Sequence, residues 1–127
     1  MSGSDYPKRK LSHDNYKTDE WILKMFHGWF DPCPLDPEWK QDGLLRAWKR
    51  NTFVNPPYSN PLPWVRRAIQ DNKEYGFTIV MLLKHDSSTE WYRLLHEAGA
   101  KFLLVSGRLK HQTGKGAAFP SVLAVLA

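Results

Sequence analysis

The sequence feature that most constrains the fold is the run from Phe77 to Leu83 (FTIVMLL), which is apolar apart from Thr78. A run without polar alternation is typical of a strand that is buried on both faces of a sheet. Such a strand needs a covering layer on each face, and helices supply that layer in α/β proteins. We therefore expect an α/β fold.

Apolar periodicity and turn residues place the other elements around this strand. Strands alternate with helices along most of the chain, and two strands come last, which predicts a mostly parallel sheet that ends in an antiparallel hairpin. Thr18 and either Ser87 or Ser88 are the expected helix N-caps, and Gly99 is an expected C-cap. The expected helices are 18–29, 63–73 and 87–98, with one or two turns in 42–49; the expected strands are 52–54, 77–83, 101–105 and 121–126, plus a short one that ends at Asp31.

Size and composition indicate one globular domain. The 127 residues predict a single domain at 16–127, preceded by a flexible basic arm at 1–15. Six Trp, five Tyr and six Phe exclude a disordered chain, and the absence of a run of about 18 apolar residues excludes a membrane span. The one cysteine, Cys33, cannot form an internal disulfide, which fits a reducing cytoplasm. The net charge of +5 favours a polyanionic partner.

The motif with the clearest chemistry is Asn55-Pro56-Pro57-Tyr58, directly after a predicted strand. Ligands of α/β sheets bind at the carboxyl ends of the strands. The Asn55 amide oxygen and the Pro56 carbonyl supply two acceptors for the hydrogens of an exocyclic amine on a base, and the prolines hold the carbonyl rigidly. Tyr58 provides a flat surface on which an extruded base can stack. The alternative is a structural turn in which Asn55 bonds backbone and Tyr58 packs in the core.

Further motifs in one order extend the pattern over most of the chain. From Tyr16 to the C-terminus, the sequence resembles the phage-type, Dam-like DNA adenine methyltransferases. The segments that carry the resemblance are Tyr16-Lys17-Thr18, Asp31-Pro32-Cys33, Asp42-Gly43-Leu44 with Trp48, Phe53 to Ser59 with Trp64, Gly107-Arg108-Leu109 and Phe119-Pro120-Ser121.

The resemblance implies a small Rossmann-like methyltransferase fold and S-adenosylmethionine as the methyl donor. It assigns Asn55, Pro56, Pro57 and Tyr58 to the target-adenine pocket, and Thr18, Asp31 and Pro32 to the cofactor. Asp42 or Asp36 would bind the cofactor ribose, with Asp42 preferred, although either can equally be a loop cap. Cys33 is then a packing residue. The family usually has proline where this chain has Asp19, directly after Thr18.

Basic residues predict contacts with double-stranded DNA from which the target base is flipped. Lys84 follows the central strand, and Arg108, Lys110 and Lys115 lie in a loop with two glycines, although a solvated loop is an equal alternative. A homodimer would help so small a protein to hold a duplex. Methylation of RNA or protein by the same motif, or a nucleic-acid-binding relic without catalysis, are the alternative functions.

Overall fold

The computed structural model describes residues 19–34, 42–105 and 120–127. Helices and strands mix within this part of the chain, so the predicted α/β class is confirmed. The elements are α1 (Glu20–Met25), the short 3-10 helix η1 (Gly43–Leu45), β1 (Asn51–Val54), α2 (Leu62–Tyr75), β2 (Thr78–Lys84), α3 (Glu90–Glu97), β3 (Lys101–Leu104) and β4 (Ser121–Leu126).

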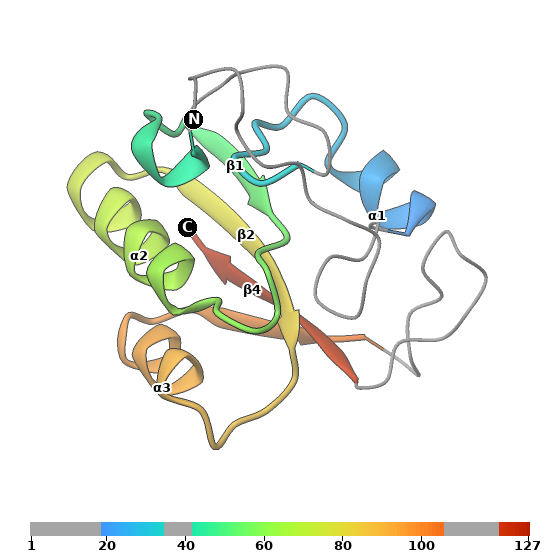
Figure 1. The fold of residues 1–127 in the computed structure, drawn as a ribbon, viewed down its shortest axis with the longest axis vertical. Coiled ribbons are helices and arrows are strands. Elements are labelled where there is room, and N and C mark those ends of the chain that lie inside the picture. Colours follow the sequence, from blue (N-terminus) through green and yellow to red (C-terminus); the bar gives the residue numbers. More distant parts are fainter. Residues whose placement is uncertain (1–18, 35–41, 106–119) are drawn as a thin grey trace, which may run out of the picture.

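The described strands form a four-stranded sheet in the order β1-β2-β4-β3 (Figure 1). Strand β1 is parallel to β2, and α2 connects them, but β4 is antiparallel to both of its neighbours. The prediction of a mostly parallel sheet was therefore wrong. The reason is that the last strand lies between β2 and β3, so one reversed strand makes two of the three pairings antiparallel. The predicted antiparallel pairing of the last two strands is confirmed.

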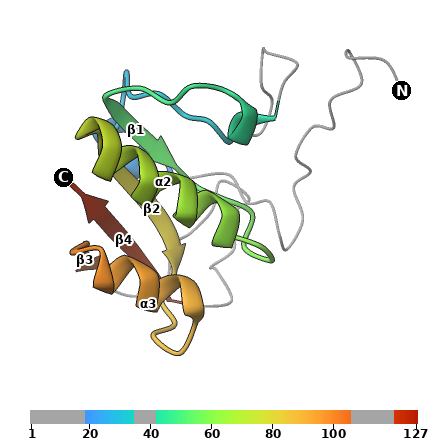
Figure 2. The same ribbon diagram turned by 90° about the vertical axis from the view of Figure 1, so that its left-hand side faces the viewer.

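Helices cover both faces of the sheet. Helices α2 and α3 lie on one face (Figure 2), and α1, whose Ile22 packs in the other hydrophobic cluster, covers the opposite face. Two hydrophobic clusters fill these layers. The larger contains Val65 and Ala68 of α2 together with Leu95 of α3, and the smaller is built around Ile22 of α1 and Phe53 of β1.

Strand β2 contributes to both clusters in alternation. Ile79, Met81 and Leu83 belong to the cluster under α2 and α3, whereas Val80 and Leu82 belong to the cluster under α1. This is the expected consequence of a side-chain period of two in a strand that is covered on both sides. The prediction of a central strand buried on both faces is confirmed.

The helix ends differ from the prediction where local polar groups compete. Helix α3 begins at Glu90, and its N-cap is Thr89, whose hydroxyl accepts a hydrogen bond from the Tyr92 amide, rather than Ser87 or Ser88. Ser88 instead donates to the Asp86 carboxylate from both its hydroxyl and its amide. Asp19 is the N-cap residue of α1, while the expected cap, Thr18, lies outside the described residues.

Glycines with a positive φ follow two of the helices, α3 and α1. The end of α3 was predicted, whereas the end of α1 comes earlier than predicted. Gly99 follows α3 with φ +83°, which confirms the predicted stop. Gly28, with φ +84°, lies just beyond α1, which ends at Met25 although the periodicity predicted a helix to Trp29. A left-handed residue cannot continue a right-handed helix, so the chain turns here toward Phe30.

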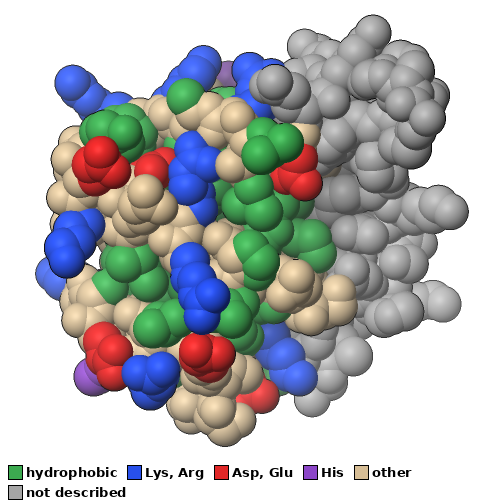
Figure 3. All heavy atoms as spheres, turned by 60° about the vertical axis from the view of Figure 1, so that its left-hand side comes forward, with side chains coloured by type: hydrophobic (Ala, Val, Ile, Leu, Met, Phe, Trp, Pro, Cys, Tyr) green, Lys and Arg blue, Asp and Glu red, His purple; other side chains and the backbone are tan. Residues whose placement is uncertain are grey.

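The outer surface of the layer formed by α2 and α3 carries charges of both signs. Figure 3 shows Lys and Arg side chains interspersed with Asp and Glu over this face. The ion pairs between Arg66 and Glu90 and between Arg93 and Glu97 are examples. Mixed charges of this kind favour solubility over attraction of a polyanion.

The two-sided burial of β2 gives a direct test of the fold. Leu82→Ala should lower the free energy of unfolding by about 2–5 kcal/mol, because Leu82 is completely buried and its removal leaves a cavity. Leu104→Ala is the matched control on the edge strand, where the leucine is 69% exposed, and should cost less than about 0.5 kcal/mol. Urea denaturation of both variants measures the difference; equal losses would contradict this account of the core.

Candidate functional site

Three chain segments end at the same edge of the sheet. Phe30 forms a parallel bridge with Thr52 of β1, and β1 is parallel to β2, so all three run in one direction. Strand β4 runs the other way and therefore begins at this edge, where Ser121 is paired with Lys84. The edge, called here the carboxyl edge, brings Asp31, Asn55, Lys84 and Ser121 to one end of the sheet.

The Asn55-Pro56-Pro57-Tyr58 segment leaves β1 at the carboxyl edge, as the sequence predicted. Asn55 is 3% exposed and Pro56 less than 2%, whereas Pro57 and Tyr58 are half-buried. The Pro57 carbonyl accepts a hydrogen bond from the Asn60 amide at 3.2 Å, which closes a turn. Within the described residues, no backbone amide donates to the Pro56 carbonyl.

The Asp31-Pro32-Cys33 segment lies beside this motif on the outer side of β1. The Asp31 carboxylate accepts a hydrogen bond from the Cys33 amide at 2.9 Å, so the carboxylate is held in a defined orientation. Pro32 is buried, and so is Cys33, which packs in the larger hydrophobic cluster as the sequence predicted.

Gly43 fixes the distance between this segment and the next motif along the chain. A Cβ atom at Gly43 would lie 1.7 Å from the Pro32 carbonyl oxygen, so only a glycine permits the contact. The segments around Asp31 and Asp42 are therefore packed against each other. Asp42 itself is exposed, and its carboxylate accepts from the Leu44 amide at 2.8 Å as the cap of η1.

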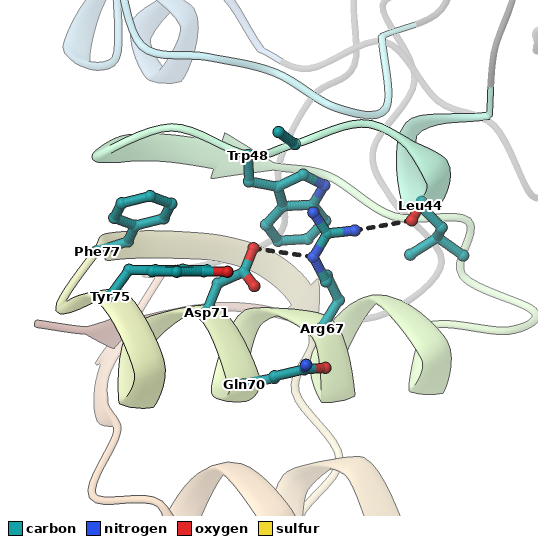
Figure 4. Close-up of a pocket in the computed structure, with 8 residues that line it drawn as sticks. Leu44, Trp48, Arg67, Gln70, Asp71, Tyr75 and Phe77 are labelled. Carbon is teal, nitrogen blue, oxygen red and sulfur yellow. Dashed lines mark hydrogen bonds and ion pairs between the residues drawn. The ribbon is translucent and has the colours of Figure 1, made fainter.

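Arg67 of α2 forms contacts, called here the Arg67 clamp, that hold η1 and the following Arg46 in place. Sequence reasoning did not identify Arg67. Its guanidinium donates to the carbonyls of Leu44 at 2.7 Å and Arg46 at 2.6 Å, and to the Asp71 carboxylate at 2.8 Å. It also stacks over the Trp48 ring, 5.0 Å from the centroid (Figure 4). The available sequence signal was an Arg and an Asp four residues apart on a helix, a spacing more often found on solvated faces.

A cavity of about 480 Å³ lies beside this clamp. It is lined by Leu44, Ala47, Trp48, Arg67, Gln70, Asp71, Tyr75 and Phe77 (Figure 4). Trp48 precedes β1, and Phe77 precedes β2, so the cavity adjoins the amino ends of these strands. It is therefore separate from the carboxyl edge that carries Asn55.

The loop after β2 also belongs to the carboxyl edge. Lys84 is exposed there, and the His85 amide donates to the Pro120 carbonyl at 2.8 Å, which ties the loop to the start of β4. The hydrogen bonds from the Ser88 hydroxyl and amide lower the pKa of Asp86. These contacts make the loop a fixed border of the edge.

Several predicted site residues lie outside the described residues: Thr18, Asp36, Arg108, Lys110 and Lys115. Of the predicted cofactor residues, the structure thus places Asp31, Pro32 and Asp42, and it brings all three to one region. No group of three or more His, Cys, Asp or Glu side chains suited to a metal ion occurs in residues 19–34, 42–105 and 120–127, and no helix there is long and apolar enough to cross a membrane.

Comparison with known proteins decides the family. The model of the family described as DNA N-6-adenine-methyltransferase (Dam) matches residues 37–118. This chain belongs to the Dam family. The match includes Asn55 to Tyr58 and the Asp42-Gly43-Leu44 segment, whereas Asp31 and Pro32 precede the matched residues and Ser121 follows them.

Two curated members of the Dam family come from phages. The chain is 34% identical over 99 residues to the DNA N-6-adenine-methyltransferase of Haemophilus phage HP1 (strain HP1c1), an alignment that covers 66% of this chain and 57% of the relative. It is 37% identical over 68 residues to the protein of the same name from Escherichia phage T1, which covers 52% and 28% respectively. The chain thus spans little more than half of the first relative and under a third of the second. No solved structure gives a significant match.

The Arg67 clamp gives a prediction about stability. Arg67→Ala should lower the free energy of unfolding by about 3 kcal/mol, because it leaves the Asp71 carboxylate, 6% exposed, buried without its partner and removes two donors to backbone carbonyls. Arg66→Ala is the matched control, since the Arg66 side chain is 61% exposed and pairs with Glu90 only at the surface. Equal effects of the two substitutions in chemical denaturation would show that the clamp contributes little.

Gly43 gives a second prediction, which separates steric from conformational effects. Gly43→Ala should cost about 3 kcal/mol or more, because backbone atoms of Pro32 must move to admit the methyl group. Gly28→Ala meets no atom within 4 Å and should cost only about 1 kcal/mol, for its left-handed backbone. Thermal denaturation of the two variants checks the order, and a more stable Gly43→Ala variant would contradict it.

Proposed function

We propose that the chain transfers a methyl group from S-adenosylmethionine to the exocyclic N6 amine of adenine in DNA. The observation that carries this proposal is the placement of Asn55 and Pro56 at the carboxyl edge, buried and directly after β1. The family match and the names of the two phage relatives support the same reaction.

The acceptor geometry explains how these residues would promote the reaction. The amine of adenine is a weak nucleophile because its lone pair is delocalised into the ring. Two acceptors aimed at the amine hydrogens favour the pyramidal form of the nitrogen, in which the lone pair is available for attack. The Asn55 amide oxygen and the Pro56 carbonyl provide such a pair, and Pro56 and Pro57 restrict the backbone so that little reorganisation is needed. Tyr58, half-buried beside them, would stack on the flipped base.

The donor set around Asp31 fits the cofactor. S-adenosylmethionine, when bound, supplies an electrophilic methyl group on a sulfonium. The oriented Asp31 carboxylate would accept from the ammonium of its methionine part, and Pro32 would pack nearby. An Asp42 carboxylate oxygen already accepts from the Leu44 amide, yet a carboxylate has about four acceptor positions, so capping leaves capacity for ribose hydroxyls. We keep Thr18 in this set as a prediction from the sequence.

The arrangement of the strands also supports a Rossmann-like methyltransferase fold. Strand β1, helix α2 and strand β2 form a parallel crossover unit, and Phe30 adds a parallel segment on the other side of β1. Ligands of open α/β sheets bind beyond the carboxyl ends of such strands. We infer a small Rossmann-like methyltransferase fold in which β4 supplies the antiparallel neighbour.

DNA would approach the carboxyl edge. Lys84 is exposed there, whereas the face over α2 and α3 carries both signs of charge (Figure 3). Lys84, together with Arg108, Lys110 and Lys115, would contact phosphates of a duplex, and a flipped adenine would enter between Asn55 and Tyr58. A homodimer would allow two such edges to hold one duplex.

The decisive experiment uses methyl-labelled S-adenosylmethionine, unmethylated double-stranded DNA and identification of the labelled nucleoside. We expect label in N6-methyladenine, and Asn55→Ala should reduce turnover by about 100-fold or more, because it removes an acceptor that acts on the reacting nitrogen. Cofactor affinity, measured by calorimetry, should change little. Asn60→Ala, in the exposed part of the same turn, is the control and should stay active.

Each other result has a definite meaning. An active Asn55→Ala enzyme would remove this residue from the reaction. Cofactor binding with no label in DNA would direct the search to RNA or protein substrates. DNA binding without cofactor binding would support the alternative that the chain is a nucleic-acid-binding relic without catalysis.

A further inference from the structure

Ser121, the first residue of β4, carries a buried hydroxyl that the reaction described so far does not use. The residue is 1% exposed, and its Oγ has no hydrogen-bond partner among the described residues. Buried polar groups are nearly always hydrogen-bonded, because an unpartnered one loses its interactions with water and gains none. An unpartnered hydroxyl at the edge of a sheet where ligands bind is a candidate for a ligand contact.

The register of the sheet places Ser121 at the carboxyl edge. Ser121 is paired with Lys84 of β2 on one side, and its carbonyl accepts from the Val105 amide at 3.3 Å on the other. Lys84 ends β2 at the same edge at which β1 gives way to Asn55.

Side-chain alternation puts Ser121 and Asn55 on the same face of the sheet. Leu123, two residues after Ser121, belongs to the cluster under α1. Phe53, two residues before Asn55, belongs to the same cluster. Because side chains two residues apart in a strand point to the same face, Ser121 lies on the α1 side of the sheet, and the alternation of β1, continued by one residue, gives Asn55 the same side.

The order of the segments separates the base side of the site from the cofactor side. Across the sheet the order is the Phe30 segment, β1, β2 and then β4. Asp31 and Pro32 follow Phe30, so the proposed cofactor residues lie on one side of Asn55 and Ser121 lies on the other. Two strand spacings separate the β1 and β4 backbones, which is about 10 Å, and the register adds about 7 Å along the strands. A purine ring with a hydrogen bond at each end spans a distance of this order.

We propose that the Ser121 hydroxyl donates a hydrogen bond to a ring nitrogen of the target adenine and is a specificity-determining residue of the base pocket. This inference rests on the proposed function. Adenine presents acceptor nitrogens in its ring besides its amine, and a serine hydroxyl can donate to one of them. Asn55 and Pro56 would then hold the reacting amine while Ser121 holds the ring, so that the base is oriented at two points.

The test compares wild-type protein, Ser121→Ala and the control Glu97→Ala. Glu97 is an exposed residue at the C-terminal end of α3, away from the carboxyl edge, so its substitution should leave methylation unchanged. Ser121→Ala should reduce kcat/KM for DNA methylation about three- to tenfold, the range expected for one neutral hydrogen bond. Its cofactor Kd should stay within about twofold of wild type, and its Tm should be equal or higher, because an unpartnered buried hydroxyl has been removed.

The outcomes separate this inference from the function on which it rests. Wild-type protein that transfers no label to DNA overturns both. Active wild-type protein with a Ser121→Ala variant of equal kcat/KM overturns only the role of Ser121. A parallel loss of cofactor affinity would move the hydroxyl to the cofactor side, and a clear fall in Tm would make it a structural group; either result overturns the assignment to the base.

Discussion

The burial of β2 on both faces is the constraint on which the rest of the structure depends. Ile79, Met81 and Leu83 must be covered by α2 and α3, while Val80 and Leu82 must be covered by α1. Because both coverings are needed, the chain has to cross from one face to the other around β1. The Phe30 segment, β1 and β2 run parallel, and this brings their ends to one edge, where the polar side chains of the candidate site are found.

A few contacts hold the described part of the connection between the Phe30 segment and β1, residues 42–50, against its neighbours. Gly43 permits direct packing on the Pro32 backbone, and Arg67 satisfies two carbonyls of the connection while it pairs with the buried Asp71. Trp48 adds a hydrogen bond from its indole to the Gly43 carbonyl at 2.9 Å. These contacts hold residues 43–48 against Pro32 and α2, which suits a site that needs preorganised acceptors.

The position of β4 has a functional consequence as well as a topological one. A strand inserted antiparallel between β2 and β3 begins, rather than ends, at the carboxyl edge. It thus delivers Ser121 and the Pro120 carbonyl to an edge that is otherwise built from strand ends. A fully parallel sheet would have placed the first residue of this strand at the opposite edge, away from Asn55.

The sequence by itself determined the α/β class, the central strand, the positions of the helices within a few residues and the location of the Asn55 motif after a strand. These features follow from local periodicity and turn chemistry, which act over a few residues. Only the tertiary structure decided which strands are neighbours, and hence that the sheet is mostly antiparallel, because pairing depends on contacts between distant segments. The same holds for Gly43 against Pro32, for Arg67 and for Ser121. Gly43 and Ser121 stand in motifs of the sequence, but the role of each residue comes from a partner, or from burial, that the chain reaches only when folded.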